Sequence, residues 1–285
     1  MMDSHVTELI RSSGLHRIED ALIAASLSSL KMNVTAEEDD GIPSGHSKLG
    51  GKPDMRAETE WPMYNKRPLH FIGQVNFEEM EEQLSHLPRQ GLLSIFYDAY
   101  EQPWGFDPAD RGRWKLLYFD NIEGLERKEE PEEIMEQGSF SSAISTFTMQ
   151  TTLPPWESLL MESLQLTDEE DDLYMQLGEE IQEYYSQGEF VHRVLGHPDL
   201  IQGDMQLECQ LVTNGLYCGD NSGYDDPRRN ILEQGAGSWK LLLQIDSDEA
   251  AGMSWGSEGR LYFWILEQDL LERNFDHVWV VLQCS

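Results

Sequence analysis

Basic residues are scarce in this sequence. Its 285 residues include 20 lysines and arginines against 53 aspartates and glutamates, so the formal net charge at pH 7 is −33. A surface of that sign repels nucleic acid phosphates and anionic lipids and attracts cationic partners. Solubility and salt adaptation are the commoner reasons for an acidic surface. We therefore expect no nucleic acid and no membrane among the partners.

Cysteines and long apolar runs are scarce as well. Cys209, Cys218 and Cys284 are odd in number and lack C-x-x-C spacing, which fits neither a disulfide framework nor a zinc ribbon. No basic segment followed by an apolar run opens the sequence, and no apolar run reaches the roughly 18 residues that span a bilayer. These features predict a cytoplasmic protein without a structural metal.

Phosphate-binding and nucleophile motifs are missing. The sequence contains neither G-x-x-x-x-G-K followed by Ser or Thr, nor G-x-G-x-x-G after a strand, nor G-x-S-x-G. Cofactor-dependent enzymes of the common kinds use such segments to hold a phosphate or to present a serine. We therefore expect no cofactor, and we favour a protein that is not an enzyme.

The residues that are present predict a folded α+β protein with a helical N-terminus. Apolar residues recur at helical spacing from Leu15 to Lys31, which predicts an amphipathic helix. Gly14 separates it from a shorter helix that ends at Ser13. The polar stretch from Thr35 to Lys48 predicts a loop.

Apolar β-forming runs follow. They predict strands over Leu69–Phe77, Gly91–Tyr97, Trp114–Phe119 and Ser141–Thr151. Between the first two of these strands, apolar residues on one side of Glu78–Leu87 predict a short surface helix. The sequence of the first half therefore predicts a mainly antiparallel sheet.

Two acidic helices are predicted next. Pro155 suits the first turn of one of them. Thr167 and Glu170 form a capping box at the start of the other, because hydroxyl and carboxylate each satisfy a free backbone N–H of the first turn. The buried stripe of this second helix is predicted at Leu173, Leu177, Ile181 and Tyr184.

The pattern of the first half then returns in the same order. The matching pairs are the turns 51–55 and 196–200, the strands 69–76 and 239–246, the strands 91–97 and 259–265, and the strands 114–119 and 278–284. This order predicts a tandem duplication. We expect helices and a loop over 1–46, a first α+β repeat over 47–152, acidic helices over 153–190 and a second repeat over 191–285, packed as one compact domain.

Short blocks along the chain also have a familiar pattern. They are Ser47–Pro53, Glu60–Pro62, Phe71–Asn76, Leu195–Gln202, Leu241–Asp248 and Trp255–Gly256. In this order, from about Leu15 to Cys284, they resemble the signature blocks of the bacterial YwqG-like proteins, although Ser257 stands where that pattern usually has Asp. The resemblance implies a duplicated α+β fold. It implies no activity, because that family is one of unknown function.

One tight group of residues can hold a metal or act in a hydrolase. It consists of His192, His197, Asp199 and Asp204. The first half has Lys52 in place of His197, and Pro and Asp in this turn serve backbone geometry. We therefore favour a structural role for the group.

Gln74 and Gln244 each lie in an otherwise apolar strand, at the same place in the two halves. A buried amide must find hydrogen-bond partners. The structural interpretation is that each Gln locks its strand to a loop. The functional one is that both line a cleft between the repeats and bind a polar ligand. The further candidates for that ligand site are Asp246, Asp248, Trp255, His197, Asp199 and Gln202, although we favour a turn-capping role for the residues after the second strand.

Acidic residues concentrate between positions 129 and 192. This segment holds sixteen acidic residues and no Lys or Arg. The usual explanation is a solvated face. The sharper one is a docking face for a basic protein or peptide, with Asp171, Asp172, Glu179 and Glu180 beside the apolar stripe of the capped helix.

Three functions remain open. The favoured one is a non-enzymatic cytoplasmic interaction protein, immunity-like or regulatory, that binds a basic partner through its acidic face. The second is binding of a small polar ligand in a cleft between the repeats. The third is a hydrolase that uses the residues from His192 to Asp204. The sequence leaves the oligomeric state open.

Overall fold

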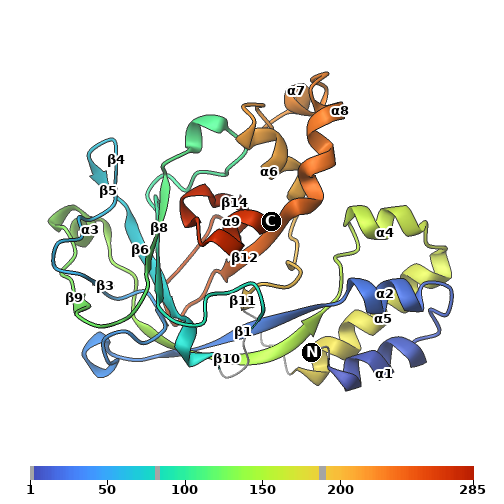
Figure 1. The fold of residues 1–285 in the computed structure, drawn as a ribbon, viewed down its shortest axis with the longest axis horizontal. Coiled ribbons are helices and arrows are strands. Elements are labelled where there is room, and N and C mark those ends of the chain that lie inside the picture. Colours follow the sequence, from blue (N-terminus) through green and yellow to red (C-terminus); the bar gives the residue numbers. More distant parts are fainter. Residues whose placement is uncertain (1–2, 81–83, 186–190) are drawn as a thin grey trace.

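A curled ten-stranded antiparallel sheet organises the molecule (Figure 1). The computed structural model describes residues 3–80, 84–185 and 191–285. The strand order is β14-β13-β12-β11-β1-β10-β2-β6-β7-β8. The strands are β1 Leu27–Ala36, β2 Lys48–Leu49, β6 His70–Asn76, β7 Leu92–Tyr97, β8 Trp114–Phe119, β10 Ala143–Thr152, β11 His192–Val194, β12 Trp239–Asp246, β13 Arg260–Leu266 and β14 Trp279–Gln283. Two short pairs lie apart from this sheet, β3 Asp54–Met55 with β9 Glu126–Arg127, and β4 Met63–Tyr64 with β5 Arg67–Pro68.

The central strands form a long ribbon. β1 and β10 pair antiparallel over ten residues, from Leu27 opposite Thr152 to Ala36 opposite Ala143. Leu30 and Met32 of β1 point into the core, whereas most of the intervening side chains are only partly buried, as alternation along a strand requires. The ribbon extends from the curled part of the sheet to a separate group of helices (Figure 1).

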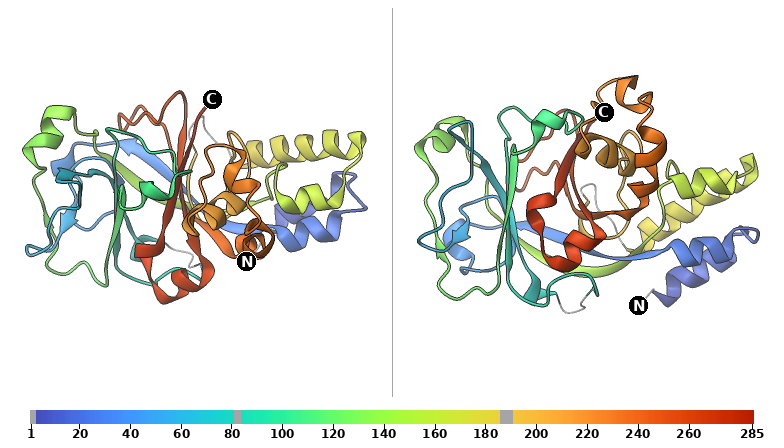
Figure 2. Two further views of the ribbon diagram at one scale, coloured as in Figure 1. Left: turned by 90° about the horizontal axis from the view of Figure 1, so that it is seen from above. Right: turned by 45° about the horizontal axis from the view of Figure 1, so that its top comes forward.

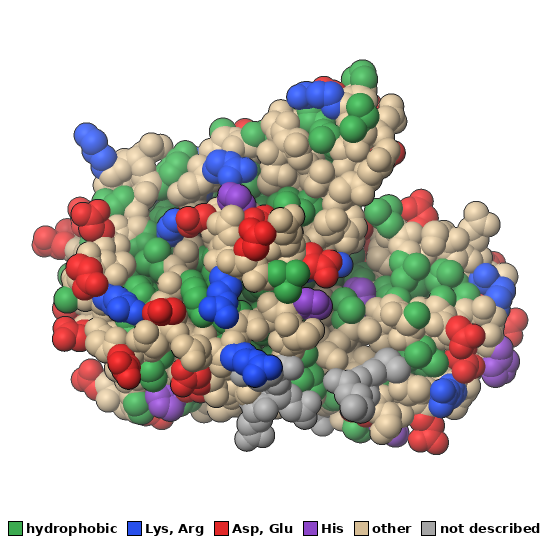
Figure 3. All heavy atoms as spheres, in the orientation of Figure 1, with side chains coloured by type: hydrophobic (Ala, Val, Ile, Leu, Met, Phe, Trp, Pro, Cys, Tyr) green, Lys and Arg blue, Asp and Glu red, His purple; other side chains and the backbone are tan. Residues whose placement is uncertain are grey.

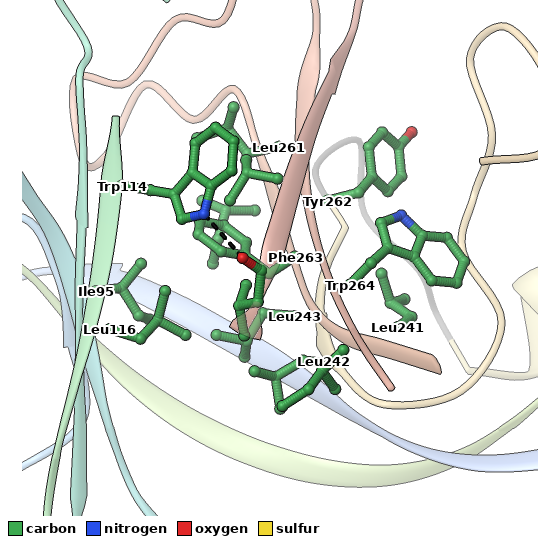
Figure 4. Packing of buried hydrophobic residues seen from close by; sticks show 14 of the residues in the cluster. Ile95, Trp114, Leu116, Leu241, Leu242, Leu243, Leu261, Tyr262, Phe263 and Trp264 are labelled. Atoms are coloured by element: carbon green, nitrogen blue, oxygen red, sulfur yellow. Dashed lines mark hydrogen bonds between the residues drawn. The ribbon is translucent and has the colours of Figure 1, made fainter. Parts of the chain in front are cut away.

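The sheet curls until its two edge strands meet, which makes it nearly a closed barrel (Figure 2). The ring of Trp114 in β8 packs edge-on against that of Trp279 in β14, with centroids 4.9 Å apart. The indole of Trp114 also donates a hydrogen bond to the carbonyl of Val278 at 2.9 Å. In the interior, Ile95 and Leu116 face the strands of the other end of the sheet (Figure 4). Aromatic packing thus covers edges that would otherwise be open to pairing.

A helical lobe stands beside the barrel (Figure 1). It contains α1 Ser4–Ser12, α2 Glu19–Ala25, α4 Leu159–Leu164 and α5 Asp168–Tyr184. These helices have a core of their own, with Ile10, Leu22 and Leu177 among its buried residues. Arg17 ties the lobe together by a bidentate bond to Glu170, at 2.8 and 2.7 Å.

The remaining helices lie around the two halves of the barrel. They are α3 Glu132–Gln137, α6 Gln206–Thr213, α7 Asn221–Tyr224, α8 Arg229–Leu232 and α9 Glu267–Glu272, with short 3₁₀ turns at Asp39–Gly41, Phe77–Glu79, Pro108–Asp110, Glu233–Ser238 and Phe275–His277. α6 packs against β12 and β14. Within the described residues, every helix is too short or too polar to cross a membrane.

Most of the predicted strands are confirmed, and so is the capped helix. Thr167 and Glu170 form both bonds of the capping box at the start of α5. Tyr184, predicted in the buried stripe of that helix, is 44% exposed, and Tyr174 is buried instead. The helix predicted to begin at Pro155 starts at Leu159, because Ser158 provides the N-cap.

Two predictions near the N-terminus are wrong. The helix predicted from Leu15 to Lys31 ends at Ala25, and residues 27–36 form β1 instead. The loop predicted from Thr35 to Lys48 therefore begins later, and it includes a 3₁₀ turn. The cause is long-range pairing with β10, which outweighs a helix-like spacing of apolar residues. The helix predicted over 78–87 falls partly outside the described residues, and only the 3₁₀ turn at its start is seen.

Candidate functional site

Gln74 is fully buried in β6 and bonds the first residue of β3 and the loop before β2. Its Oε1 accepts from the backbone N–H of Asp54 at 3.0 Å. Its Nε2 donates to the carbonyl of His46 at 2.8 Å and to the carboxylate of Asp54 at 2.7 Å. The amide oxygen accepts one hydrogen bond and the amide nitrogen donates two, all within the chain. The side chain therefore fixes the strand β6 to the neighbouring loop.

Gln244 is fully buried in β12 and makes the same set of bonds in the second half. Its Oε1 accepts from the N–H of Asp199 at 2.9 Å, and its Nε2 donates to the carbonyl of Val191 and to the carboxylate of Asp199, at 2.8 and 3.1 Å. The backbones correspond as well. Gln74 lies opposite Lys48 in the sheet, and Gln244 lies opposite Arg193.

A buried cation accompanies each lock. Lys48 is fully buried and lies 2.6 Å from Asp39, while Asp54 accepts from Arg127 at 2.8 Å. In the second half, Arg193 is 2% exposed and pairs with Asp199 at 2.5 Å. Buried charges need partners of opposite sign, so these pairs hold the turns in place.

The acidic candidates after the second strand also serve the local structure. Asp246 accepts from the N–H of Val191 and from Arg260, at 3.0 and 2.8 Å. Asp248 accepts from the N–H groups of Ala250 and Ala251, which caps a turn.

His192 links both of these acids. Its Nδ1 accepts from the N–H of Asp246 at 3.1 Å, so the other ring nitrogen carries the proton that it donates to Asp248 at 2.9 Å. Burial acts to raise the pKa of Asp248, but the hydrogen bonds from His192 and the backbone lower it below the ordinary value. Both ring nitrogens of His192 are therefore hydrogen-bonded within the chain.

Two further candidates are engaged elsewhere. Trp255 is fully buried, packs against the rings of Tyr97 and Phe140, and donates to the carbonyl of Asp246 at 3.2 Å. Gln202 donates to the carbonyl of Cys284 at 2.9 Å. Of the eight side chains predicted to bind a ligand, only His197 and Asp199 line a hollow described below.

The described residues line at least three hollows. The most enclosed of the three lies between the helical lobe and the outer face of β12 and β13. It has a volume of about 270 Å³. Its wall contains Leu27 from β1, Leu159 and Leu160 from α4, and Leu241 and Leu270 from the barrel side. Figure 3 shows hydrophobic side chains gathered in the hollow between the helical lobe and the helices α6–α8. We call this hollow the lobe cavity.

Two indoles form part of the wall of the lobe cavity, Trp239 and Trp264. Trp239 donates to Gln210 at 2.8 Å, whereas the buried Nε1 of Trp264 has no hydrogen-bond partner among the residues that the structure describes. Figure 4 shows that Trp264 and Leu241 lie on the face of the sheet opposite to the packed interior.

Asp204 and His197, both from the group predicted to act in a hydrolase, also line the lobe cavity. Asp204 accepts from the N–H of Gln206 at 3.1 Å through Oδ1, while its buried Oδ2 has no hydrogen-bond partner within residues 3–80, 84–185 and 191–285. Burial raises the pKa of Asp204, against the lowering effect of nearby backbone N–H groups. Burial also lowers the pKa of His197 to about 4, so its ring is neutral at physiological pH.

The ring of His197 has a defined tautomer. Its Nε2 lies 2.8 Å from the carbonyl of Ala25 and must donate to it, which leaves Nδ1 as an acceptor. The backbone beside it is strained: Leu195 has φ +56°, a left-handed conformation that costs a non-glycine residue about 1–2 kcal/mol. Gly50 takes the corresponding place in the first half, with φ +60°. Strain of this kind gathers at functional sites.

The group from His192 to Asp204 does not converge on one point. His192 bonds Asp248, His197 bonds Ala25, and Asp199 bonds Arg193. Among the residues that the structure describes, no three His, Cys, Asp or Glu side chains come close enough to hold a metal ion.

The acidic segment presents a different surface. Trp156 is 50% exposed, and its indole is fixed by a bond to Asp171 at 2.9 Å. Glu157 and Glu162 line a hollow on one side of this ring, and Glu179 lines a second hollow that also contains Asp199. Of the other two predicted acids, Asp172 is exposed, and Glu180 accepts from Gln176 at 2.9 Å.

Sequence reasoning missed Trp264, Leu159 and Leu160 as parts of a site. Their signal was weak, because an apolar residue at helical or strand spacing indicates a core position. Only the structure shows that Leu159 and Leu160 are 49% and 38% exposed. A helix with so short a buried stripe leaves apolar surface for another contact.

A comparison with curated proteins finds no match to this sequence. A comparison with protein families finds one over residues 47–284, most of the chain. The matched region omits β1, which nevertheless lies between β10 and β11 in the sheet, and Leu27 of β1 lines the lobe cavity. With a match of this extent, the chain belongs to the family described as "Domain of unknown function (DUF1963)".

Proposed function

We propose that this protein binds a small, largely apolar molecule in the lobe cavity. The observation that carries the proposal is that two residues of the cavity wall, Trp264 and Asp204, each have a buried polar atom, Nε1 and Oδ2, that finds no partner among the described residues. Each buried polar atom left unpaired costs about 1–3 kcal/mol. A bound molecule that reaches these atoms recovers that free energy.

The other tryptophans make the exception clear. Six of the eight donate their indole N–H to a partner within the chain, and Trp104 is 40% exposed. The remaining tryptophan, Trp264, is only 2% exposed, and its indole N–H has no partner among the described residues. Because buried indoles are satisfied elsewhere in this fold, the unpaired group in a cavity wall favours a site over a packing defect.

The walls of the lobe cavity suit an apolar ligand. Leu27, Leu159 and Leu160 are exposed where they line the lobe cavity, and a ligand would remove them from water. The volume of about 270 Å³ lies just below the roughly 300–1,000 Å³ of most ligand pockets. A ligand of modest size, with one polar end, fits both features.

Filling the cavity should abolish binding. We expect at least one of octanol, octylamine and octanoate to bind the wild-type protein with one-site behaviour by calorimetry. Leu159→Trp should weaken that binding at least tenfold, because the indole occupies the cavity. Ile231→Trp is the matched control, since Ile231 is 75% exposed on α8 and lines none of the hollows described. If none of the three binds in a manner sensitive to Leu159→Trp, the proposal is wrong.

We also propose that the two halves arose by tandem duplication. Support comes from the matching bonds of Gln74 and Gln244, the positive φ angles at Gly50 and Leu195, and the shared irregularity in the pairing of β6 with β7 and of β12 with β13. The closer kinship to the YwqG-like proteins is part of the same proposal, and it rests on the ordered sequence blocks.

A second candidate function has an observation of its own. The half-exposed ring of Trp156, held by Asp171 and flanked by carboxylates, suits a Lys or Arg side chain of a basic protein partner. Met175, 59% exposed beside Glu179, adds apolar contact. This is the docking face predicted from the acidic segment, centred on Trp156.

Charge reversal tests the docking face. Glu157→Lys, Glu162→Lys and Glu179→Lys together should weaken capture of a basic partner from host-cell extract at least tenfold, because steering and the close pairs are both lost. Capture by the wild type should also fall as salt rises. The control reverses three exposed acids at the other end of the molecule, Glu58, Glu60 and Glu123. Equal losses in both variants would point to net charge alone and would contradict a defined face.

A further inference from the structure

We infer that the ligand of the lobe cavity carries a protonated amine that pairs with Asp204. The inference rests on the proposed function, because it names the class of molecule that the same cavity takes. Asp204 supplies a buried carboxylate oxygen that has no hydrogen-bond partner in the described part of the chain. An ammonium group, with three donors, is the complement of such an oxygen.

The other charges in the wall of the lobe cavity are already compensated. Lys240 lies 3.9 Å from Glu267 and donates to the carbonyl of Gly237 at 3.3 Å. His86 lies 3.8 Å from the other oxygen of Glu267. In the described part of the chain, Asp204 has no ion-pair partner, and only backbone N–H groups lie near it. The lining therefore has one charge that a ligand can neutralise, and it is negative.

The neutral groups in the wall agree with this assignment. His197 offers Nδ1 as an acceptor, because Nε2 donates to the carbonyl of Ala25. The indole rings of Trp239 and Trp264 also line the cavity, and an indole attracts a cation placed over its face by about 0.5–2 kcal/mol. The N–H of Trp264 is left for an oxygen of the ligand or for a water molecule in the same space.

The electrostatic field of the whole protein also favours a cationic ligand. With a net charge of −33, the surface repels an approaching anion and concentrates cations near it. Lys240 is the one Lys or Arg side chain in the described lining, and it is 40% exposed and paired with Glu267. A carboxylate ligand would have to displace that pairing, whereas an amine meets the Asp204 carboxylate, which has no ion-pair partner among the described residues.

Three eight-carbon probes separate the cavity from its head-group preference. We expect octylamine to bind about tenfold to a hundredfold more tightly than octanol, since a charge-assisted bond contributes about 1.5–3 kcal/mol. Octanoate should bind most weakly. The measurement is isothermal titration calorimetry at neutral pH and moderate salt, with each probe below its aggregation limit.

Asp204→Asn tests the residue itself. Asparagine keeps Oδ1, which accepts from the N–H of Gln206, so the turn before α6 is preserved. The advantage of octylamine over octanol should disappear in this variant, while octanol binds as before. Glu272→Gln is the matched control, because it removes an exposed carboxylate of α9 that lines none of the hollows described, and it should leave the advantage in place.

The outcomes are distinct. Octylamine binding that survives Leu159→Trp would be adsorption to the acidic surface and would overturn the inference. Octanol or octanoate binding as tightly as octylamine, and lost in Leu159→Trp, would also overturn it but leave the proposed function intact. If no probe binds in a manner sensitive to Leu159→Trp, the proposed function fails too.

Discussion

Replacing Asp54 by alanine should lower the free energy of unfolding by about 3–5 kcal/mol, the usual cost of removing one partner of a buried ion pair. Asp54 is fully buried. Its carboxylate accepts from Arg127 at 2.8 Å, from the N–H of Gly45 at 2.9 Å and from Gln74 at 2.7 Å. The variant leaves those donors short of a partner, and the lock between β6 and its loop is lost.

The pH dependence of this effect has a definite sign. Burial acts to raise the pKa of Asp54, but bonds from Arg127, Gly45 and Gln74 lower it below the ordinary value. A carboxyl whose pKa is lowered by folding stabilises the fold at neutral pH, and that contribution is lost as pH falls through the folded pKa. The stability gap between wild type and Asp54→Ala should therefore narrow below about pH 4.

Urea denaturation at neutral and acidic pH measures both effects. The control is Asp120→Ala, which removes a surface carboxylate 2.9 Å from Arg56. The side chain of Asp120 is 70% exposed, so this change should cost less than about 1 kcal/mol. A similar small loss in Asp54→Ala would show that the buried network contributes little to the fold.

Trp255→Ala should destabilise the protein by about 3–5 kcal/mol, as expected for removal of a large buried aromatic side chain. The indole is fully buried, packs against Tyr97 and Phe140 with centroids 5.9 and 5.6 Å away, and donates to the carbonyl of Asp246. The indole of Trp255 contacts residues of both halves of the chain. Its removal leaves an empty space between the halves and so weakens the packing of one half against the other.

Thermal and urea unfolding of Trp255→Ala should be compared with those of Trp104→Ala, whose side chain is 40% exposed. We expect less than half the loss in the control. The sequence offered Trp255 as a ligand-binding candidate. Wild-type stability in Trp255→Ala, together with loss of ligand binding, would favour that role over a role in packing the two halves together.

The features predictable from the sequence were those set by local chemistry. The capping box of Thr167 and Glu170 depends on residues three positions apart, so it marked the start of α5. Gln74 and Gln244 stood out because an amide in an apolar strand must be bonded, and both proved to be fully buried and bonded within the chain.

The errors came from contacts between distant residues. Leu27 to Lys31 continued a helical spacing, yet these residues pair with residues 148–152 of β10. No local signal distinguishes the two structures, because the deciding partner is more than a hundred residues away. Tertiary pairing outweighs a local preference worth a few tenths of a kcal/mol per residue.

The lobe cavity could not be predicted for the same reason. Its wall combines segments near Leu27, Leu159, His197, Trp239 and Trp264. The sequence did single out His197 and Asp204, but as members of a metal or hydrolase group. Trp264 resembles any core aromatic in a strand. Only the assembled fold shows that its N–H lacks a partner.

A crystal structure of the protein with octylamine tests the central claim most directly. It should show the alkyl chain between Leu159 and Trp239, with the amine nitrogen about 3 Å from Oδ2 of Asp204. An octylamine molecule bound elsewhere, or a cavity in which ordered waters alone satisfy Asp204 and Trp264, would contradict the account.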